Sequence, residues 1–73
     1  MNIKNIKDIA RIIKQTRKKQ NLTQVQLAGA SGVGIRFIVD LEKGKETCQI
    51  GKTLRIIKML GIDIDVVLPE GDK

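Results

Sequence analysis

The sequence of 73 residues lacks the residues from which most metal and redox sites are built. It contains no histidine and a single cysteine, Cys48. One cysteine cannot form an internal disulfide, and without histidine there is no Cys/His cluster to bind a metal ion. We therefore expect no metal and no cofactor, and a reducing cytoplasmic compartment suits the chain.

Aromatic residues and long apolar runs are also scarce. With one phenylalanine and no tyrosine or tryptophan, the chain has no row of aromatic side chains on which single-stranded bases could stack. No apolar run approaches the roughly 20 residues that span a bilayer. Residues 1–14 have neither a continuous apolar segment nor a small-residue cleavage site, so we expect no signal peptide among them. We expect a soluble protein with no membrane partner.

No combination of residues in the sequence indicates catalysis. The GKT at 51–53 ends like a phosphate-binding loop, but Glu46 stands where that motif requires glycine and no strand precedes it. The glycines within 29–34 do not have the spacing or context of a dinucleotide-binding turn. Cys48 has no histidine to activate it. The sequence therefore predicts a protein that is not an enzyme.

Charge is distributed unevenly along the chain. Residues 1–60 carry 13 Lys and Arg against 4 Asp and Glu, whereas residues 61–73 carry one Lys against four acids. A basic body with an acidic tail favours a polyanion as partner of the body. Since aromatic residues for single strands are missing, double-stranded DNA is the preferred candidate. The alternative is a charged surface that only keeps the protein soluble.

Apolar residues recur at helical spacing in four segments, and residues with strong capping preferences stand between them. Asn21 can end the first helix in a left-handed conformation, and Thr23 with Gln26 forms a capping box for the second. Gly32 suits a tight turn, and Gly44 suits the end of the third helix. The predicted helices cover residues 5–19, 24–30, 34–42 and 50–60.

Each predicted helix has an apolar face that can contribute to one shared core. The residues expected there are Ile6, Ile9, Ala10 and Ile13 in the first helix, Leu27 and Ala28 in the second, Phe37, Ile38 and Leu41 in the third, and Ile50, Leu54, Ile57 and Leu60 in the fourth. A domain of this size has a small core, so association with a second copy would stabilise it.

The two short middle helices, joined by residues 31–33, have the layout of a helix-turn-helix. The segment LTQVQLAGASGVGIRFIVDLEKGKET at 22–47 contains L-T-Q-x-x-L-A, then G-V, then L-E-x-G-K. It strongly resembles the phage-repressor-like (Xre/Cro type) helix-turn-helix family over about residues 5–61. With RFIVDLEKGK and the closing GIDIDVVLP, the chain looks most similar to HipB-like antitoxins, the DNA-binding partners of HipA-type kinase toxins. The resemblance implies an all-α, lambda-repressor-like domain over residues 1–61.

The resemblance also implies roles for individual residues. Gln24 would bind a backbone phosphate or only cap its helix, and Arg17 with Glu42 would form a structural ion pair. Lys43 and Lys45 would contact phosphates after the recognition helix, and Arg11, Lys52 and Arg55 could widen that footprint. The residues that would face the bases are Gly34, Ile35, Arg36, Val39 and Asp40.

Among the base-facing residues, Arg36 is the one strong reader. It could contact guanine O6 and N7 bidentately, or it could pair only with phosphate. Ile35 could pack on a thymine methyl, and Gly34 would let the backbone approach a phosphate closely. Asp40 could accept from cytosine N4 or repel wrong registers. With so few direct hydrogen bonds, DNA shape would carry more of the specificity.

After the fourth helix the apolar period changes to two, which predicts a strand over residues 62–68. The residues expected on its apolar face are Ile62, Ile64, Val66 and Leu68. A single strand leaves its backbone N–H and C=O groups without partners. The simplest partner is the same strand of a second subunit, antiparallel across a two-fold axis; the alternative is residues 1–4 of the same chain. Residues 69–73 are expected to fray.

Together these features predict a homodimeric, sequence-specific repressor that binds a palindromic operator. The HipB resemblance implies an antitoxin that represses its own promoter and binds a HipA-like kinase toxin. Two other interpretations stay open. One is a stand-alone phage or host repressor without a toxin. The other is a helical protein-interaction module that has lost DNA binding, which the apolar start of the third helix favours.

Overall fold

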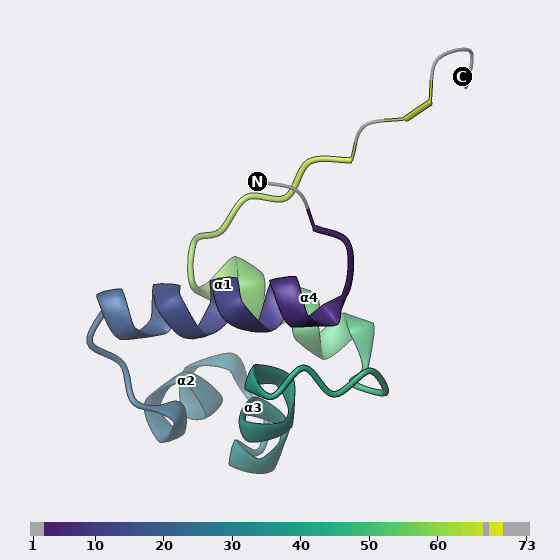
Figure 1. Ribbon diagram of the computed structural model, residues 1–73. Helices are drawn as coiled ribbons and strands as arrows, with labels where there is room; N and C mark the ends of the chain where they lie inside the picture. The colour runs from purple at the N-terminus through teal and green to yellow at the C-terminus, as the bar shows by residue number, and fades with distance from the viewer. Residues whose placement is uncertain (1–2, 67, 70–73) are drawn as a thin grey trace.

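The computed structural model describes residues 3–66 and 68–69 of the chain. It contains α1 (Ile6–Lys19), α2 (Gln24–Ser31), α3 (Ile35–Glu42) and α4 (Ile50–Met59) (Figure 1). The four predicted helices are confirmed, and each end lies within one residue of its expected place. Within the described residues, no helix is both long and apolar enough to cross a membrane.

Short polar and glycine signals determine where the helices begin and end. The Thr23 side chain accepts the backbone N–H of Gln26, and the Gln26 side chain accepts that of Thr23, so the predicted capping box is present. Gly32 ends α2 with φ of +69°. Gly44 follows α3 with φ of +81°, and a Cβ there would lie 3.1 Å from Cγ of Lys7. The positive φ favours glycine at position 44, and the close approach of α1 would leave a Cβ there little room.

The core lies where all four helices meet. Its largest fully buried apolar side chains are Ile13 of α1, Leu27 of α2, Ile38 and Leu41 of α3, and Ile56 of α4. Ala28 is also buried, at the side of α2 that packs against the core. In Figure 1, α1 and α4 lie on one side of the domain and the helix-turn-helix, α2 and α3, lies on the other. This arrangement leaves the outer surface of α2 and α3 open to a partner.

The predicted core face of α4 was partly wrong. We expected Ile50 and Leu54 to be buried, but their side chains are 65% and 50% exposed. The helix is rotated so that Thr53 and Ile56 are buried in their place. A buried threonine is tolerated because its hydroxyl donates to the carbonyl of Gln49 at 2.9 Å. The spacing of apolar residues alone could not predict that Thr53 is buried.

Because α4 is rotated, an apolar groove of about 920 Å³ opens along its outer side. The groove is lined by isoleucines of α1, by Ile50 and Leu54 of α4, and by Ile62 and Ile64 of the following segment. That segment leaves the helices on the side away from α2 and α3 (Figure 1). A partner bound in the groove would therefore not block the helix-turn-helix.

The C-terminal segment forms no strand in the part of the chain that the structure describes. Residues 3 and 4 do not pair with 62–66 in a ladder, so the alternative of a strand closed within one chain is not seen. Val66 is 81% exposed and Leu68 60% exposed. Val67 of the expected strand and residues 70–73 of the expected tail lie outside the described residues. Pairing with a second subunit stays a prediction.

Within the described part of the chain, two hydroxyls are buried in the core, and only one of them has a hydrogen-bond partner. Replacing each in turn tests how such a bond affects the free energy of unfolding. Thr53 has its hydrogen bond, whereas Oγ of Ser31, a residue 3% exposed, has no partner among the described residues. We expect Ser31→Ala to raise the free energy of unfolding by about 1 kcal/mol, because an unsatisfied buried hydroxyl is removed. We expect Thr53→Val to lower it by a similar amount, about 1 kcal/mol, because a satisfied hydroxyl is lost.

Thermal unfolding followed by circular dichroism would measure both variants. For a domain of this size, each 1 kcal/mol shifts the Tm by about 4–8 °C. The two shifts should have opposite signs. A fall in Tm for Ser31→Ala would show that this hydroxyl is satisfied in solution.

Candidate nucleic-acid interface

Helix α3 has a buried face and an exposed face. Ile38 and Leu41 are fully buried in the core. The residues on the other face are Gly34, Ile35 and Arg36, which are exposed, and Val39 and Asp40, which are half-buried. Residues 35, 36, 39 and 40 share one side of a helix because of the 3.6-residue period. The structure therefore gathers the five expected base-facing residues on the solvent side of α3.

Arg36 is the most accessible charged group on this face. Its side chain is 85% exposed. Ile35 beside it is 45% exposed. An arginine and an isoleucine can together read a guanine edge and a thymine methyl in the major groove.

Asp40 makes two ion pairs that the sequence analysis did not predict. Its Oδ1 lies 3.5 Å from Nε of Arg36, and its Oδ2 lies 3.5 Å from Nζ of Lys45. The signal for the first pair was the i,i+4 spacing of Arg36 and Asp40 on one helix. In the described structure, the carboxylate that was expected to contact a base is therefore already ion-paired with two cations of the protein.

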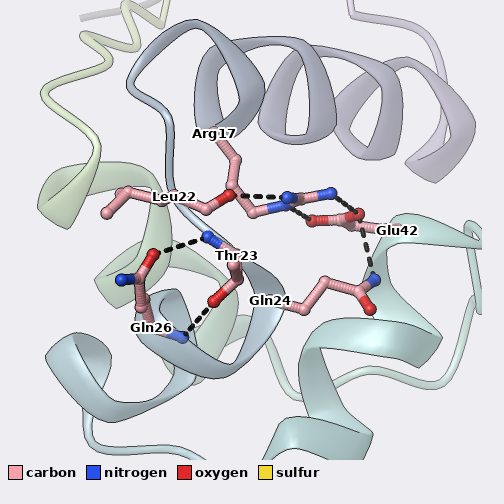
Figure 2. A network of polar contacts seen from close by, with 6 residues as sticks. All are labelled: Arg17, Leu22, Thr23, Gln24, Gln26 and Glu42. Atoms are coloured by element: carbon pink, nitrogen blue, oxygen red, sulfur yellow. Dashed lines mark hydrogen bonds and ion pairs between the residues drawn. The ribbon is translucent and has the colours of Figure 1, made fainter.

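Arg17 and Glu42 form a bidentate ion pair between α1 and the end of α3 (Figure 2). The Arg17 Nε lies 2.6 Å from Oε2 and Nη2 lies 3.0 Å from Oε1 of Glu42, while Nη1 donates to the carbonyl of Leu22 at 2.7 Å. The two side chains are 10% and 4% exposed. The hydrogen bond to Glu42 raises the pKa of Arg17 above its ordinary value. The pair fixes the C-terminal end of α3 to α1.

Gln24 joins the same network at the start of α2. Its Nε2 donates to Oε1 of Glu42 at 3.2 Å (Figure 2), a contact that the sequence analysis missed. An amide nitrogen carries two hydrogens, so a second donor is left after this bond. Glu42 thus orients the side chain through which Gln24 could bind a phosphate beside the first N–H groups of α2.

The loop after α3 brings further cations to this side of the domain. Lys43 and Lys45 are both exposed. Gly44 between them is buried against Lys7, so the first turn of α1 lies next to the loop. Lys7, Lys43 and Lys45 therefore surround Gly44, next to the C-terminal end of α3.

The three cations expected to widen the footprint each have a contact within the protein. Arg11 pairs with Asp8 at 3.2 Å on α1. Nζ of Lys52 lies 5.6 Å from the centroid of the Phe37 ring, a cation–π distance. The third cation, Arg55, donates to the carbonyl of Ser31 at 3.5 Å. These contacts place Lys52 and Arg55 at the junctions of α4 with α3 and α2.

Phe37 and Cys48 lie beside this face without belonging to it. Phe37 is half-buried and packs against the core, as expected. Burial raises the pKa of the Cys48 thiol, the Asp40 carboxylate adds to the rise, and Lys45 opposes it. The thiol therefore stays protonated at neutral pH, which makes it a weak nucleophile.

A family profile described as helix-turn-helix matches residues 13–67. The chain belongs to the helix-turn-helix family. An uncharacterized HTH-type transcriptional regulator of Sinorhizobium fredii, y4mF, is 54% identical over 67 residues, which cover 92% of this chain and 88% of that protein. The resemblance noted in the sequence is thereby confirmed.

Solved structures share the helix-turn-helix fold of this chain. A chain of a HipB–O4 20mer complex superposes with a TM-score of 0.84, covering 96% of this chain and 99% of that one at 18% identity. A chain of a HipA–HipB–O2–O3 complex gives the same values. A chain described as MDT Protein gives a TM-score of 0.85 with 18% identity and the same coverage. At this identity the matches show the fold, with the helix-turn-helix in the same arrangement.

Proposed function

We propose that this helix-turn-helix protein is a homodimeric, sequence-specific DNA-binding repressor. We further propose that it is the antitoxin of a HipA/HipB-like operon and represses its own promoter. The observation that carries the proposal is the exposed face of α3, where Arg36 projects from a helix that the core and the Arg17–Glu42 pair hold in place. A rigid scaffold with an exposed arginine suits recognition of base edges.

The charge and the relatives support DNA as the partner. The basic body carries 13 Lys and Arg against 4 acids over residues 1–60. The similar protein y4mF is described as a transcriptional regulator. The toxin part of the proposal rests on the HipB resemblance in sequence and fold. A stand-alone repressor is the alternative, and a kinase-like reading frame beside this gene would favour the antitoxin.

We propose that the phosphate contacts flank the base-reading face. Gln24 lies at the start of α2, where a free amide hydrogen and the helix N–H groups favour an anion. Lys43 and Lys45 lie in the loop after α3. Phosphate contacts beside the C-terminal end of α3 would fix the register of Arg36 along the groove.

The decisive experiment is fluorescence-anisotropy binding to the DNA upstream of the protein's own reading frame. A scrambled duplex of the same length serves as the control, and both are measured at two salt concentrations. A preference of about a thousandfold or more, with steep salt dependence, would support a specific repressor. Equal, weak binding to both duplexes would instead support the protein-interaction module, which the exposed Ile35 at the start of α3 favours.

Replacing Arg36 tests whether it reads a base. We expect Arg36→Ala to lower affinity for the preferred duplex by about 1–3 kcal/mol and to relax discrimination at one base pair. Binding to duplexes with each substitution at that pair would measure the effect. Lys43→Ala is the matched control, because loss of a phosphate contact should weaken all duplexes equally and reduce the salt slope by about 1. A uniform loss for Arg36→Ala would mean that it contacts only phosphate.

A further inference from the structure

We propose that Asp40 is a positioning residue that determines DNA selectivity through its two cations, rather than a reader of bases. This inference rests on the proposed DNA-binding function. Asp40 would orient Arg36 for base contact, and its negative charge would penalise complexes in which no base contact is made.

The geometry of Arg36 supports the first part. Asp40 lies one helical turn after Arg36, and its carboxylate faces Nε of the guanidinium at 3.5 Å. Nε is one of three nitrogens in the planar group, and the other two form the outer end. With Nε toward Asp40, both terminal nitrogens are left to donate to O6 and N7 of one guanine.

Because Arg36 is highly exposed, holding its guanidinium in one orientation reduces the conformational entropy that it loses on binding DNA. A side chain that is 85% exposed samples many rotamers, which it must lose on binding. A carboxylate that holds the guanidinium near its bound orientation reduces that loss, as a supporting group does in other binding sites. Asp40 itself is only 21% exposed, so it lies closer to the body of the protein than the group that it holds.

The second part follows from Lys45. The other carboxylate oxygen lies 3.5 Å from Nζ of Lys45, whose side chain is 57% exposed. Phosphates of any sequence would therefore have to compete with Asp40 for both Arg36 and Lys45. At the correct site, Arg36 can keep Nε toward Asp40 while its terminal nitrogens contact guanine. Competition for Lys45 weakens binding to all DNA, whereas competition for Arg36 weakens binding to random DNA alone. Asp40 thus weakens binding to random DNA more than binding to the operator.

A role for Asp40 as a reader of cytosine is less consistent with these contacts. Each carboxylate oxygen already faces a cation of the protein, so a hydrogen bond from cytosine N4 would have to use the lone pairs that are left. The two roles also predict different results when the charge is removed. A reader affects one base pair, whereas a positioning residue affects the discrimination made by Arg36 and the affinity for all DNA.

The test compares Asp40→Asn with the wild-type chain on the preferred and scrambled duplexes at two salt concentrations. We expect the variant to bind the scrambled duplex about tenfold tighter, with a salt slope steeper by about 1–2, because Arg36 and Lys45 become available to phosphates. We expect binding to the preferred duplex to be unchanged or weaker. The ratio of the two affinities should therefore fall by about tenfold or more.

Glu46→Gln is the matched control for net charge. Glu46 is exposed next to Lys45, and no ion pair formed within residues 3–66 and 68–69 includes it. Its replacement should shift both affinities equally and leave their ratio unchanged. Asp40→Ser serves as a second variant if the asparagine disturbs folding, which a thermal melt would show. In an Arg36→Ala background, Asp40→Asn should no longer reduce discrimination at the base pair that Arg36 reads.

The outcomes separate this inference from the function on which it rests. If the wild-type chain shows no preference between the duplexes, the proposed function fails and this inference fails with it. If the wild type is selective and Asp40→Asn behaves like Glu46→Gln, only the role of Asp40 is overturned. A change in discrimination at one base pair, with unchanged affinity for the scrambled duplex, would identify Asp40 as a base reader. That result would also overturn the positioning role.

Discussion

Glu42→Ala is expected to lower the free energy of unfolding by about 3–5 kcal/mol, because it leaves the buried Arg17 charge without its partner. The Arg17 side chain is 10% exposed, and its Nε and Nη2 both lose their acceptors when the carboxylate is removed. Gln24 loses its acceptor as well. The total stability of small domains is about 5–15 kcal/mol, so this loss is a large part of it. Urea denaturation followed by circular dichroism would measure the change.

The double variant Arg17→Met with Glu42→Leu is the informative control. Replacing a buried ion pair by apolar side chains of similar size is often neutral or stabilising. We therefore expect the double variant to be more stable than Glu42→Ala. Arg11→Ala removes the exposed pair with Asp8 and should change stability little. Equal destabilisation by the single and double variants would show that the pair contributes through its own attraction rather than through the penalty of an unpaired charge.

The sequence predicted the helices well because their ends depend on neighbouring residues. Thr23 and Gln26 lie three residues apart and form their capping box within one turn. Gly32 and Gly44 adopt the positive φ that a helix end needs. Such signals require no knowledge of the rest of the chain.

Contacts between distant residues were predicted poorly from the residues alone. Arg17 and Glu42, 25 positions apart, were paired only through the family resemblance. The bond from Gln24 to Glu42 was missed altogether. For α4, the apolar pattern predicted a face with Ile50 and Leu54, whereas packing in the shared core selected the neighbouring face with Thr53 and Ile56. Asp40 was placed on the correct face, but its partners Arg36 and Lys45 were overlooked because it was considered only as a contact for DNA.

The C-terminal segment has alternating apolar residues that a single chain leaves largely uncovered. Ile62 and Ile64 line the open groove, and Val66 and Leu68 are exposed among the described residues. Alternating apolar residues at this exposure fit the proposed dimer, in which a partner would cover them. A second copy of the segment would supply both the missing backbone hydrogen bonds and an apolar cover.

The second large effect is expected from the double variant Ile64→Asp with Val66→Asp. Aspartates at both positions would place like charges on the apolar face of the paired strands and should convert the dimer to a monomer. Light scattering coupled to size-exclusion chromatography would measure the mass. Affinity for the palindromic duplex should fall by about a hundredfold or more, because the second half-site is no longer held at a high effective concentration.

Two controls distinguish loss of the dimer from loss of the fold. Asp65→Ser changes the residue between the two positions, on the opposite side of the predicted strand, and should remain dimeric. A duplex with a single half-site should bind the wild type and the double variant with similar affinity, because the reading face of α3 lies on the other side of the domain from this segment (Figure 1). A monomeric wild type, or full affinity of the double variant for the palindrome, would contradict the dimer. The protein would then have to recognise DNA with one α3 helix, and a single set of contacts from Arg36, Gln24 and the lysines after α3 would provide the affinity.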